Sequence, residues 1–141
     1  MEKRNLGNIG TKVGALGIGA MSFSDFYGPT NTQESHAILK MALDHGIDHI
    51  DTAKVYGMGL SEERIGQFLN TLSKNDQQFF KIATKGGIDR KNFDDKGTVV
   101  FDNSKEFLTE ELDNSLRRLG VDCVELYLSL IHISEPTRRY E

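Results

Sequence analysis

Short apolar runs alternate along this chain with longer stretches in which apolar residues recur at helical spacing, and this alternation restricts the fold more than any other feature. The runs predict strands over residues 15–19, 47–51, 79–85 and 121–127. The helical stretches lie between them, over residues 32–45, 61–72 and 104–119. Because strands joined by helical crossovers pair in parallel, the pattern predicts an α/β fold with a parallel sheet. It leaves open whether the sheet is doubly wound or part of a closed barrel.

Capping residues mark the ends of the first and third helices. Asn31 and Glu34 have the spacing of a capping box, and Gly46 is a natural stop. Ser104 is the expected N-cap of the third helix and Gly120 its stop. The side chains expected to be buried in the first helix are those of Ile38, Met41, Ala42 and His45.

The remaining segments are predicted from their glycine and polar content. Residues 4–14 indicate a small hairpin, and residues 21–29 and 86–103 indicate loops. A polar turn is expected over residues 73–76. Ser61 is the expected N-cap of the second helix, so the acidic residues that follow it would lie at the positive end of the helix dipole.

Composition indicates one soluble domain, or part of one, and excludes several classes of partner. Among 141 residues, 17 are Lys or Arg and 21 are Asp or Glu, without a basic block. This balance gives no electrostatic support for a nucleic-acid partner or an anionic membrane surface. No apolar run approaches the roughly 20 residues of a membrane span. The only cysteine, Cys123, is expected to be a small buried hydrophobe, and the absence of a disulfide framework predicts a cytoplasmic protein.

Two charged residues end consecutive predicted strands and a tyrosine follows the first of them. The carboxyl ends of neighbouring parallel strands lie roughly 5 Å apart, so Asp51 and Lys85 can form an ion pair. Tyr56 can approach the same point, where an ammonium group would favour its phenolate form and help it act as a general acid. On spacing alone, a solvated ion pair at the surface is the more frequent arrangement.

Other functional sites find little support in the sequence. Gly17-x-Gly19 does not continue into a Rossmann fingerprint, and there is no P-loop. His49 is more simply a hydrogen-bonded core histidine than a metal ligand, because no cluster of Cys, His and carboxylate residues has ligand spacing. We therefore expect no metal site. The aromatic residues of segment 21–29 can either line a pocket or pack on their own scaffold.

Several separated motifs over residues 4–127 resemble the N-terminal part of the aldo-keto reductase family. They are Arg4-Asn5-Leu6-Gly7, Leu16-Gly17-Ile18-Gly19-Ala20-Met21, Asp51-Thr52-Ala53-Lys54-Val55-Tyr56-Gly57, Ser61-Glu62, Ile65-Gly66, Thr84-Lys85 and the segment 112–122, in the family's order. The resemblance implies a (β/α)₈ TIM barrel, of which this chain would supply the hairpin and about three and a half βα units. It also implies an oxidoreductase that transfers hydride between NADPH and a small-molecule aldehyde or ketone.

The resemblance also implies roles for individual residues. By position, Tyr56 matches the general acid, Lys85 the residue that tunes it, and Asp51 the carboxylate paired with the lysine. The positions implied at the cofactor are Gly19, Ala20, Met21 and Asp51. A non-catalytic binding or regulatory subunit on the same barrel is the alternative. The presence together of the three catalytic positions favours the enzyme.

The sequence departs from the family after Tyr127. The family ends its fourth strand in a histidine, whereas Leu130 stands at that position here and His132 comes two residues late. Residues 128–138 resemble, codon by codon, a translated transposase sequencing adapter. We therefore expect residues 1–127 to be part of the barrel domain and residues 128–141 to be a non-native tail, the alternative being a native fourth strand extended through Ile133. A partial barrel of this kind is expected to fold poorly, to bind NADPH weakly and to be inactive.

Overall fold

A four-stranded parallel sheet forms the centre of the computed structural model, which describes residues 1–8, 10–93 and 99–130. Its order is β3-β4-β5-β8, and its strands are β3 (Gly17–Gly19), β4 (His49–Asp51), β5 (Lys81–Gly86) and β8 (Leu126–Ser129). The connecting helices are α1 (Thr32–Asp44), α2 (Leu60–Leu69), α3 (Lys74–Phe79) and α4 (Lys105–Leu119). All three pairings are parallel, so the predicted α/β fold is confirmed.

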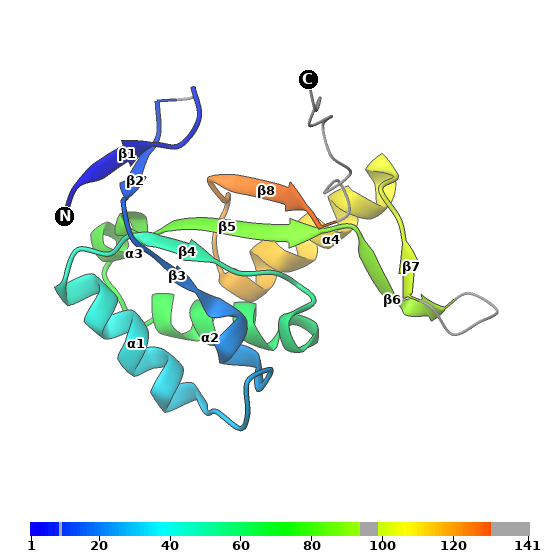
Figure 1. Cartoon of the computed structure of the whole chain (residues 1–141), viewed down its shortest axis with the longest axis horizontal. Helices are drawn as coiled ribbons and strands as arrows, with labels where there is room; N and C mark the ends of the chain where they lie inside the picture. Colours follow the sequence, from blue (N-terminus) through cyan, green and yellow to red (C-terminus); the bar gives the residue numbers. More distant parts are fainter. Residues whose placement is uncertain (9, 94–98, 131–141) are drawn as a thin grey trace, which may run out of the picture.

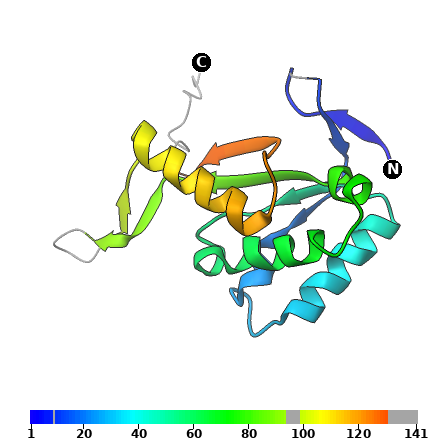
Figure 2. The same ribbon diagram turned by 180° about the vertical axis from the view of Figure 1, so that it is seen from behind.

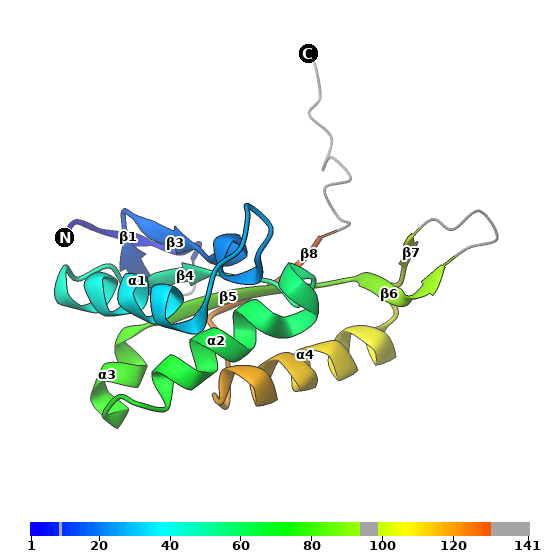
Figure 3. The ribbon, with the colours of Figure 1, turned by 90° about the horizontal axis from the view of Figure 1, so that it is seen from below.

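The long helices cover one face of the sheet. Figure 3 shows α1, α2 and α4 on the same side of the strands, and Figure 2 brings this helical layer to the front. Ile50 of β4 and Ile82 of β5 point into it. The rest of the buried core cluster comprises Ala20, Phe23, Leu39, Ala42, Ile65, Phe68, Leu69, Phe80 and Leu119. Because side chains alternate along a strand, Asp51 and Lys85 lie on the opposite face, which no helix of the described residues covers.

The predicted caps of the first and third helices are confirmed. Asn31 Oδ1 accepts a hydrogen bond from Glu34 N at 2.9 Å, and Glu34 Oε2 accepts one from Asn31 N at 3.2 Å, which completes the capping box. Ser104 Oγ accepts from Phe107 N at the start of α4. Gly120 ends α4 at a φ of +68°, a backbone conformation that favours glycine.

The face of α1 that is buried differs from the predicted one. Ile38 and Met41 are 45% and 63% exposed, whereas Ser35, Leu39 and Ala42 pack inward. Of the expected residues Ile38, Met41, Ala42 and His45, only Ala42 is buried. Both sets recur at helical spacing. The set that faces the sheet includes the polar Ser35, so it does not form a continuous apolar pattern in the sequence.

Several segments expected to be irregular are ordered elements. They are the 3₁₀ helices η1 (Ala20–Ser24) and η2 (Tyr56–Gly59), helix α3, and the strands β6 (Ile88–Phe93) and β7 (Val99–Phe101). Helix α3 replaces the expected turn at 73–76 because Ser73 Oγ accepts from Asp76 N and caps a short helix. The predicted loop at 86–103 contains an antiparallel hairpin of β6 and β7, which projects past the carboxyl end of β5 (Figure 1).

The expectation that Ser61 is the N-cap of α2 is wrong, whereas Glu62 and Glu63 lie in the first turn of that helix as expected. Gly59 is the N-cap of α2, and Ser61 and Glu62 lie fully buried inside the helix. Ser61 Oγ donates to Ala20 O at 2.8 Å. Glu62 accepts from Thr84 Oγ1 at 2.6 Å and pairs with Arg118 Nε at 2.7 Å. Glu62 therefore lies in the first turn of α2 but is buried there, where it compensates a cation of α4.

The predicted N-terminal hairpin is confirmed and is attached to the sheet through one carboxylate. Strands β1 (Lys3–Asn5) and β2 (Lys12–Gly14) pair antiparallel. Asp48, just before β4, accepts from Gly14 N at 2.6 Å and from Lys3 Nζ at 2.5 Å. This contact is at the amino end of the sheet, away from Asp51.

We predict that Asp48→Asn lowers stability at pH 7 by about 1.5–3 kcal/mol, as for other hydrogen bonds to a charged group. Desolvation raises the pKa of Asp48, but the hydrogen bonds from Lys3 and Gly14 and the charge of Lys3 outweigh it, so the folded pKa lies below 3.8. The stabilisation is therefore present above the unfolded pKa and is lost as the pH falls through the lowered folded value. Urea unfolding of the wild type and of Asp48→Asn, from pH 7 down through the lowered folded pKa, measures the difference in their free energies of unfolding. A difference that did not shrink in acid would contradict the prediction.

Candidate active site

The register of the sheet brings Asp51 and Lys85 together. Strands β4 and β5 pair with Asp51 opposite Ala83, and Lys85 lies two residues further along the same face of β5. Lys85 Nζ lies 2.7 Å from Asp51 Oδ1. The expected ion pair is therefore present at the carboxyl ends of neighbouring strands.

Lys85 also contacts the segment that follows β4. Its ammonium donates to Thr52 O at 2.9 Å and to Tyr56 Oη at 3.3 Å. The same nitrogen lies 5.0 Å from the centre of the tyrosine ring. The Lys85 side chain is 12% exposed, against 42% for Asp51, so the lysine is largely enclosed by its partners while the carboxylate faces solvent.

A tight reversal of the chain holds Tyr56. The turn begins where Tyr56 N donates to Ala53 O at 3.0 Å. Three successive residues, Gly57, Met58 and Gly59, then have φ values of +66°, +57° and +103°. Met58 adopts a conformation that side chains rarely take, which is a form of strain that clusters at functional sites.

The expected cofactor residues divide into two groups. Gly19 is exposed and pairs in register with Asp51, and no atom lies within 4 Å of where a Cβ would stand on it. Met21 is half-buried. Ala20 is fully buried and its carbonyl accepts from Ser61, so its methyl group faces the core.

A hollow of about 340 Å³ lies beside Tyr56. It is lined by Met21, Ser24, Phe26, Val55, Tyr56, Gly57 and Met58. The aromatic segment therefore both lines a pocket and packs on its own scaffold, the two arrangements that the sequence left open. Phe23 is buried in the scaffold, while Phe26 lines the hollow and is 67% exposed.

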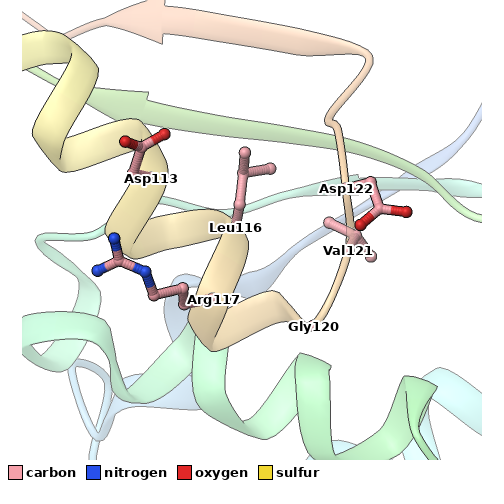
Figure 4. A pocket seen from close by; sticks show the side chains of 6 residues that line it. All are labelled: Asp113, Leu116, Arg117, Gly120, Val121 and Asp122. Carbon is pink, nitrogen blue, oxygen red and sulfur yellow. The ribbon is translucent and has the colours of Figure 1, made fainter.

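A second hollow, which Figure 4 shows, lies elsewhere. It measures about 440 Å³ and is lined by Asp113, Leu116, Arg117, Gly120, Val121 and Asp122. These residues end α4 and lead into β8, so they lie at the amino end of the sheet. It contains none of the candidate catalytic residues.

The other single residues are placed as follows. His49 is half-buried and its Nδ1 lies 3.1 Å from Lys81 O, as expected of a hydrogen-bonded histidine. Within residues 1–8, 10–93 and 99–130, no group of three or more His, Cys, Asp and Glu could hold a metal ion. The expectation of a buried Cys123 is wrong, because it lies exposed in the connection before β8. Over the same ranges, no helix is long and apolar enough to cross a membrane.

One buried ion pair beside the site was not anticipated. Lys54 Nζ lies 2.7 Å from Glu111 Oε2, and both side chains are less than a tenth exposed, at 7% and 9%. Lys54 stands in a polar loop and Glu111 in a helix rich in charge, where charged residues are usually solvated. The two residues lie far apart in the sequence, and nothing in the local sequence around either of them indicated a contact.

Comparison with known proteins identifies the family. A sequence model of the Aldo/keto reductase family matches residues 15–141. This chain belongs to the aldo/keto reductase family. It is 34% identical to "Aldo-keto reductase yakc [NADP(+)]" of Schizosaccharomyces pombe over 88% of its own length and 35% of that protein. It is 33% identical to "Aldo-keto reductase YhdN" of Bacillus subtilis over 96% of its length and 39% of that protein.

A solved structure supports the same fold. An aldo-keto reductase of Bacillus halodurans in its holo form superposes with a TM-score of 0.74 at 34% identity, over 92% of this chain and 40% of that one. The expectation of the N-terminal half of a (β/α)₈ barrel is confirmed, with the hairpin, three strand-and-helix units and a fourth strand in place. The chain spans less than two fifths of the length of the two curated relatives.

The segment after Tyr127 begins inside the sheet of this aldo/keto reductase. Leu128 and Ser129 belong to β8, and Leu130 N donates to Gly86 O at 3.0 Å. His132 and the remainder, 131–141, lie outside the described residues. The boundary between residues 1–127 and a tail at 128–141 stays a prediction.

Proposed function

We propose that the longer protein to which this chain belongs is a cytoplasmic, NADPH-dependent reductase of small-molecule aldehydes or ketones. The observation that carries the proposal is the convergence of Asp51, Lys85 and Tyr56 at one end of the sheet, with the lysine ammonium 2.7 Å from the carboxylate and 3.3 Å from the phenol. A binding subunit has no need of this constellation.

Each of the three side chains has a distinct task in this reaction. Bound NADPH supplies the hydride that reaches the carbonyl carbon. Tyr56 gives its phenolic proton to the carbonyl oxygen, which becomes the hydroxyl of the product. Lys85 faces the phenolate that remains and stabilises its negative charge. Asp51 holds the ammonium in place by pairing with it.

The residues at the end of β3 suit a bound nicotinamide cofactor. Gly19 leaves open space beside Asp51, where a side chain would stand in the way of a ligand. Gly19, Met21 and Asp51 would hold the cofactor at this edge. Ala20 would support it only through the backbone, since its methyl group is buried. The Schizosaccharomyces pombe relative carries NADP(+) in its name, which supports the choice of cofactor.

An NADPH oxidation assay on the longer protein tests the proposal. We expect loss of NADPH absorbance that depends on an aldehyde or ketone from a panel of small carbonyl compounds, with slower or no oxidation of NADH. Binding of NADPH without turnover of any compound would contradict the proposal and favour a non-catalytic binding or regulatory subunit.

We further propose that residues 1–141 alone are inactive. Asp51 and Lys85 point to a face of the sheet that no described helix covers, and the chain spans less than half of the solved relative. Desolvation of the site is therefore incomplete, which weakens its electrostatic interactions. The same assay on the 141-residue chain tests this, and carbonyl-dependent NADPH oxidation by it would contradict the proposal.

The origin of residues 128–141 has a test of its own. We propose that the native sequence diverges from this one after Tyr127 and places a histidine near position 130. Amplifying the locus across codon 128, from material prepared without transposase, gives the native codons. Recovery of the codons for residues 128–138 unchanged would refute the proposed tail.

A further inference from the structure

The Lys54–Glu111 pair connects the turn that carries Tyr56 to helix α4. The hydrogen bond from Tyr56 N to Ala53 O closes this turn, and Lys54 is its second residue. From there the lysine side chain reaches Glu111 across 2.7 Å. The backbone that positions Tyr56 is thus attached to an element 57 residues away along the chain.

The pair is largely removed from solvent, with side chains 7% and 9% exposed. In the part of the chain that the structure describes, no hydrogen bond reaches Glu111 Oε2, so the Lys54 ammonium is its sole compensation. Burial, followed by the charges of Glu111 and Glu62, raises the pKa of Tyr127 to about 12. Tyr127 stays protonated and donates to Leu108 O at 3.2 Å, so it does not relieve the carboxylate.

Stability alone gives no clear reason for such a pair. Bringing a lysine and a glutamate out of water costs free energy that their attraction only partly returns, and apolar residues of similar volume often stabilise a protein equally well. In some proteins a buried charged or polar group instead specifies one conformation. Such a role here would restrict where the lysine, and therefore the turn, can lie.

We propose that Lys54 and Glu111 are positioning residues that hold the Ala53–Tyr56 turn so that the Tyr56 hydroxyl meets Lys85. The proposal deepens the function proposed above and rests on it for its kinetic consequence. In the part of the chain that the structure describes, the hydrogen bond to the Tyr56 hydroxyl comes from Lys85 and from neither residue of the pair. Their effect is on the conformation of the turn.

The test replaces both charges in the longer protein with apolar residues, as Lys54→Met with Glu111→Leu. We expect kcat for carbonyl reduction to fall at least ten-fold while the KM for NADPH and the unfolding temperature stay close to wild type. Hydrogen exchange of the Tyr56 amide should quicken at least ten-fold, because its bond to Ala53 O opens more often. The single variant Lys54→Arg, which keeps the ion pair, should retain most of the wild-type kcat.

Lys81→Met is the matched control. Lys81 pairs with Glu125 at 3.6 Å at the amino end of the same sheet, so its loss should leave kcat and Tyr56 exchange unchanged. Wild-type kcat and wild-type exchange in the double variant would overturn the proposal. A fall in kcat matched by a fall in the folded fraction would also overturn it, by showing a structural role only.

The exchange measurement separates this proposal from the proposed function. If the wild-type protein turned over no carbonyl compound, the proposed reductase would fail. Exchange at Tyr56 in the double variant would still decide whether the pair holds the turn, since it needs no activity.

Discussion

Tyr56→Phe in the longer protein is expected to lower kcat for carbonyl reduction by about 10²–10⁴-fold, the usual contribution of a positioned general acid. The substitution removes the proton that the product hydroxyl needs and leaves the ring in place. The only hydrogen bond to the Tyr56 hydroxyl from the described residues comes from Lys85 at 3.3 Å, so little else changes. NADPH oxidation kinetics measure the effect, and an NADPH titration should show near-normal affinity.

Tyr27→Phe is the matched control for Tyr56→Phe. Tyr27 is 72% exposed in the neighbouring aromatic segment, so removing its hydroxyl should leave kcat unchanged. Equal turnover by wild type and Tyr56→Phe would show that the role given to Tyr56 is wrong, even if the protein is a reductase.

Arg118→Met is expected to have the largest effect on stability, about 3–5 kcal/mol of the free energy of unfolding. Glu62 is fully buried and Arg118 is its cation, with Arg118 Nε 2.7 Å from Glu62 Oε2. Without the arginine, Glu62 keeps, from the described residues, only the hydrogen bond from Thr84, and they leave it as a buried charge without a counter-charge. Urea unfolding of the longer protein measures the loss.

The neighbouring arginine is the control for this prediction. Arg117 is exposed and binds Asn114 Oδ1 at 2.8 Å, so Arg117→Met should change stability by no more than about 0.5 kcal/mol. The pair Glu62→Leu with Arg118→Met should recover much of the loss, because no charge is then left buried. Equal destabilisation by the two arginine variants would contradict the importance of the buried pair.

The sequence predicted most reliably those features that local chemistry determines. Asn31 with Glu34, and Gly120, mark helix ends because a side-chain acceptor or a positive φ satisfies the backbone there, whatever the tertiary context. The neighbouring placement of Asp51 and Lys85 followed from the parallel pairing of consecutive strands. The family resemblance turned that geometry into a candidate active site.

Features that depend on packing between distant segments escaped prediction. The buried face of α1 centres on Leu39, but Ile38 beside it fits an equally regular pattern. The burial of Glu62 and Lys54 was not predicted, because their partners lie on α4, far along the sequence. Cys123 was predicted to be buried because the apolar run at 121–127 predicted a strand there. Strand β8 begins only at Leu126, so Cys123 lies before it and is exposed. In each case the deciding contact is absent from the local sequence.

The alternation of side chains along strand β5 limits where residues can be inserted in this chain. Asp51 faces Ala83, and Lys85 shares that face because two residues separate it from Ala83. One residue inserted between Ala83 and Lys85 would exchange the faces and turn the lysine toward the helices. Two inserted residues would keep its orientation but carry it further along the strand. Insertions at this point can thus keep the lysine on the face of Asp51 only in even steps, whereas the β6–β7 hairpin beyond it is free of this constraint.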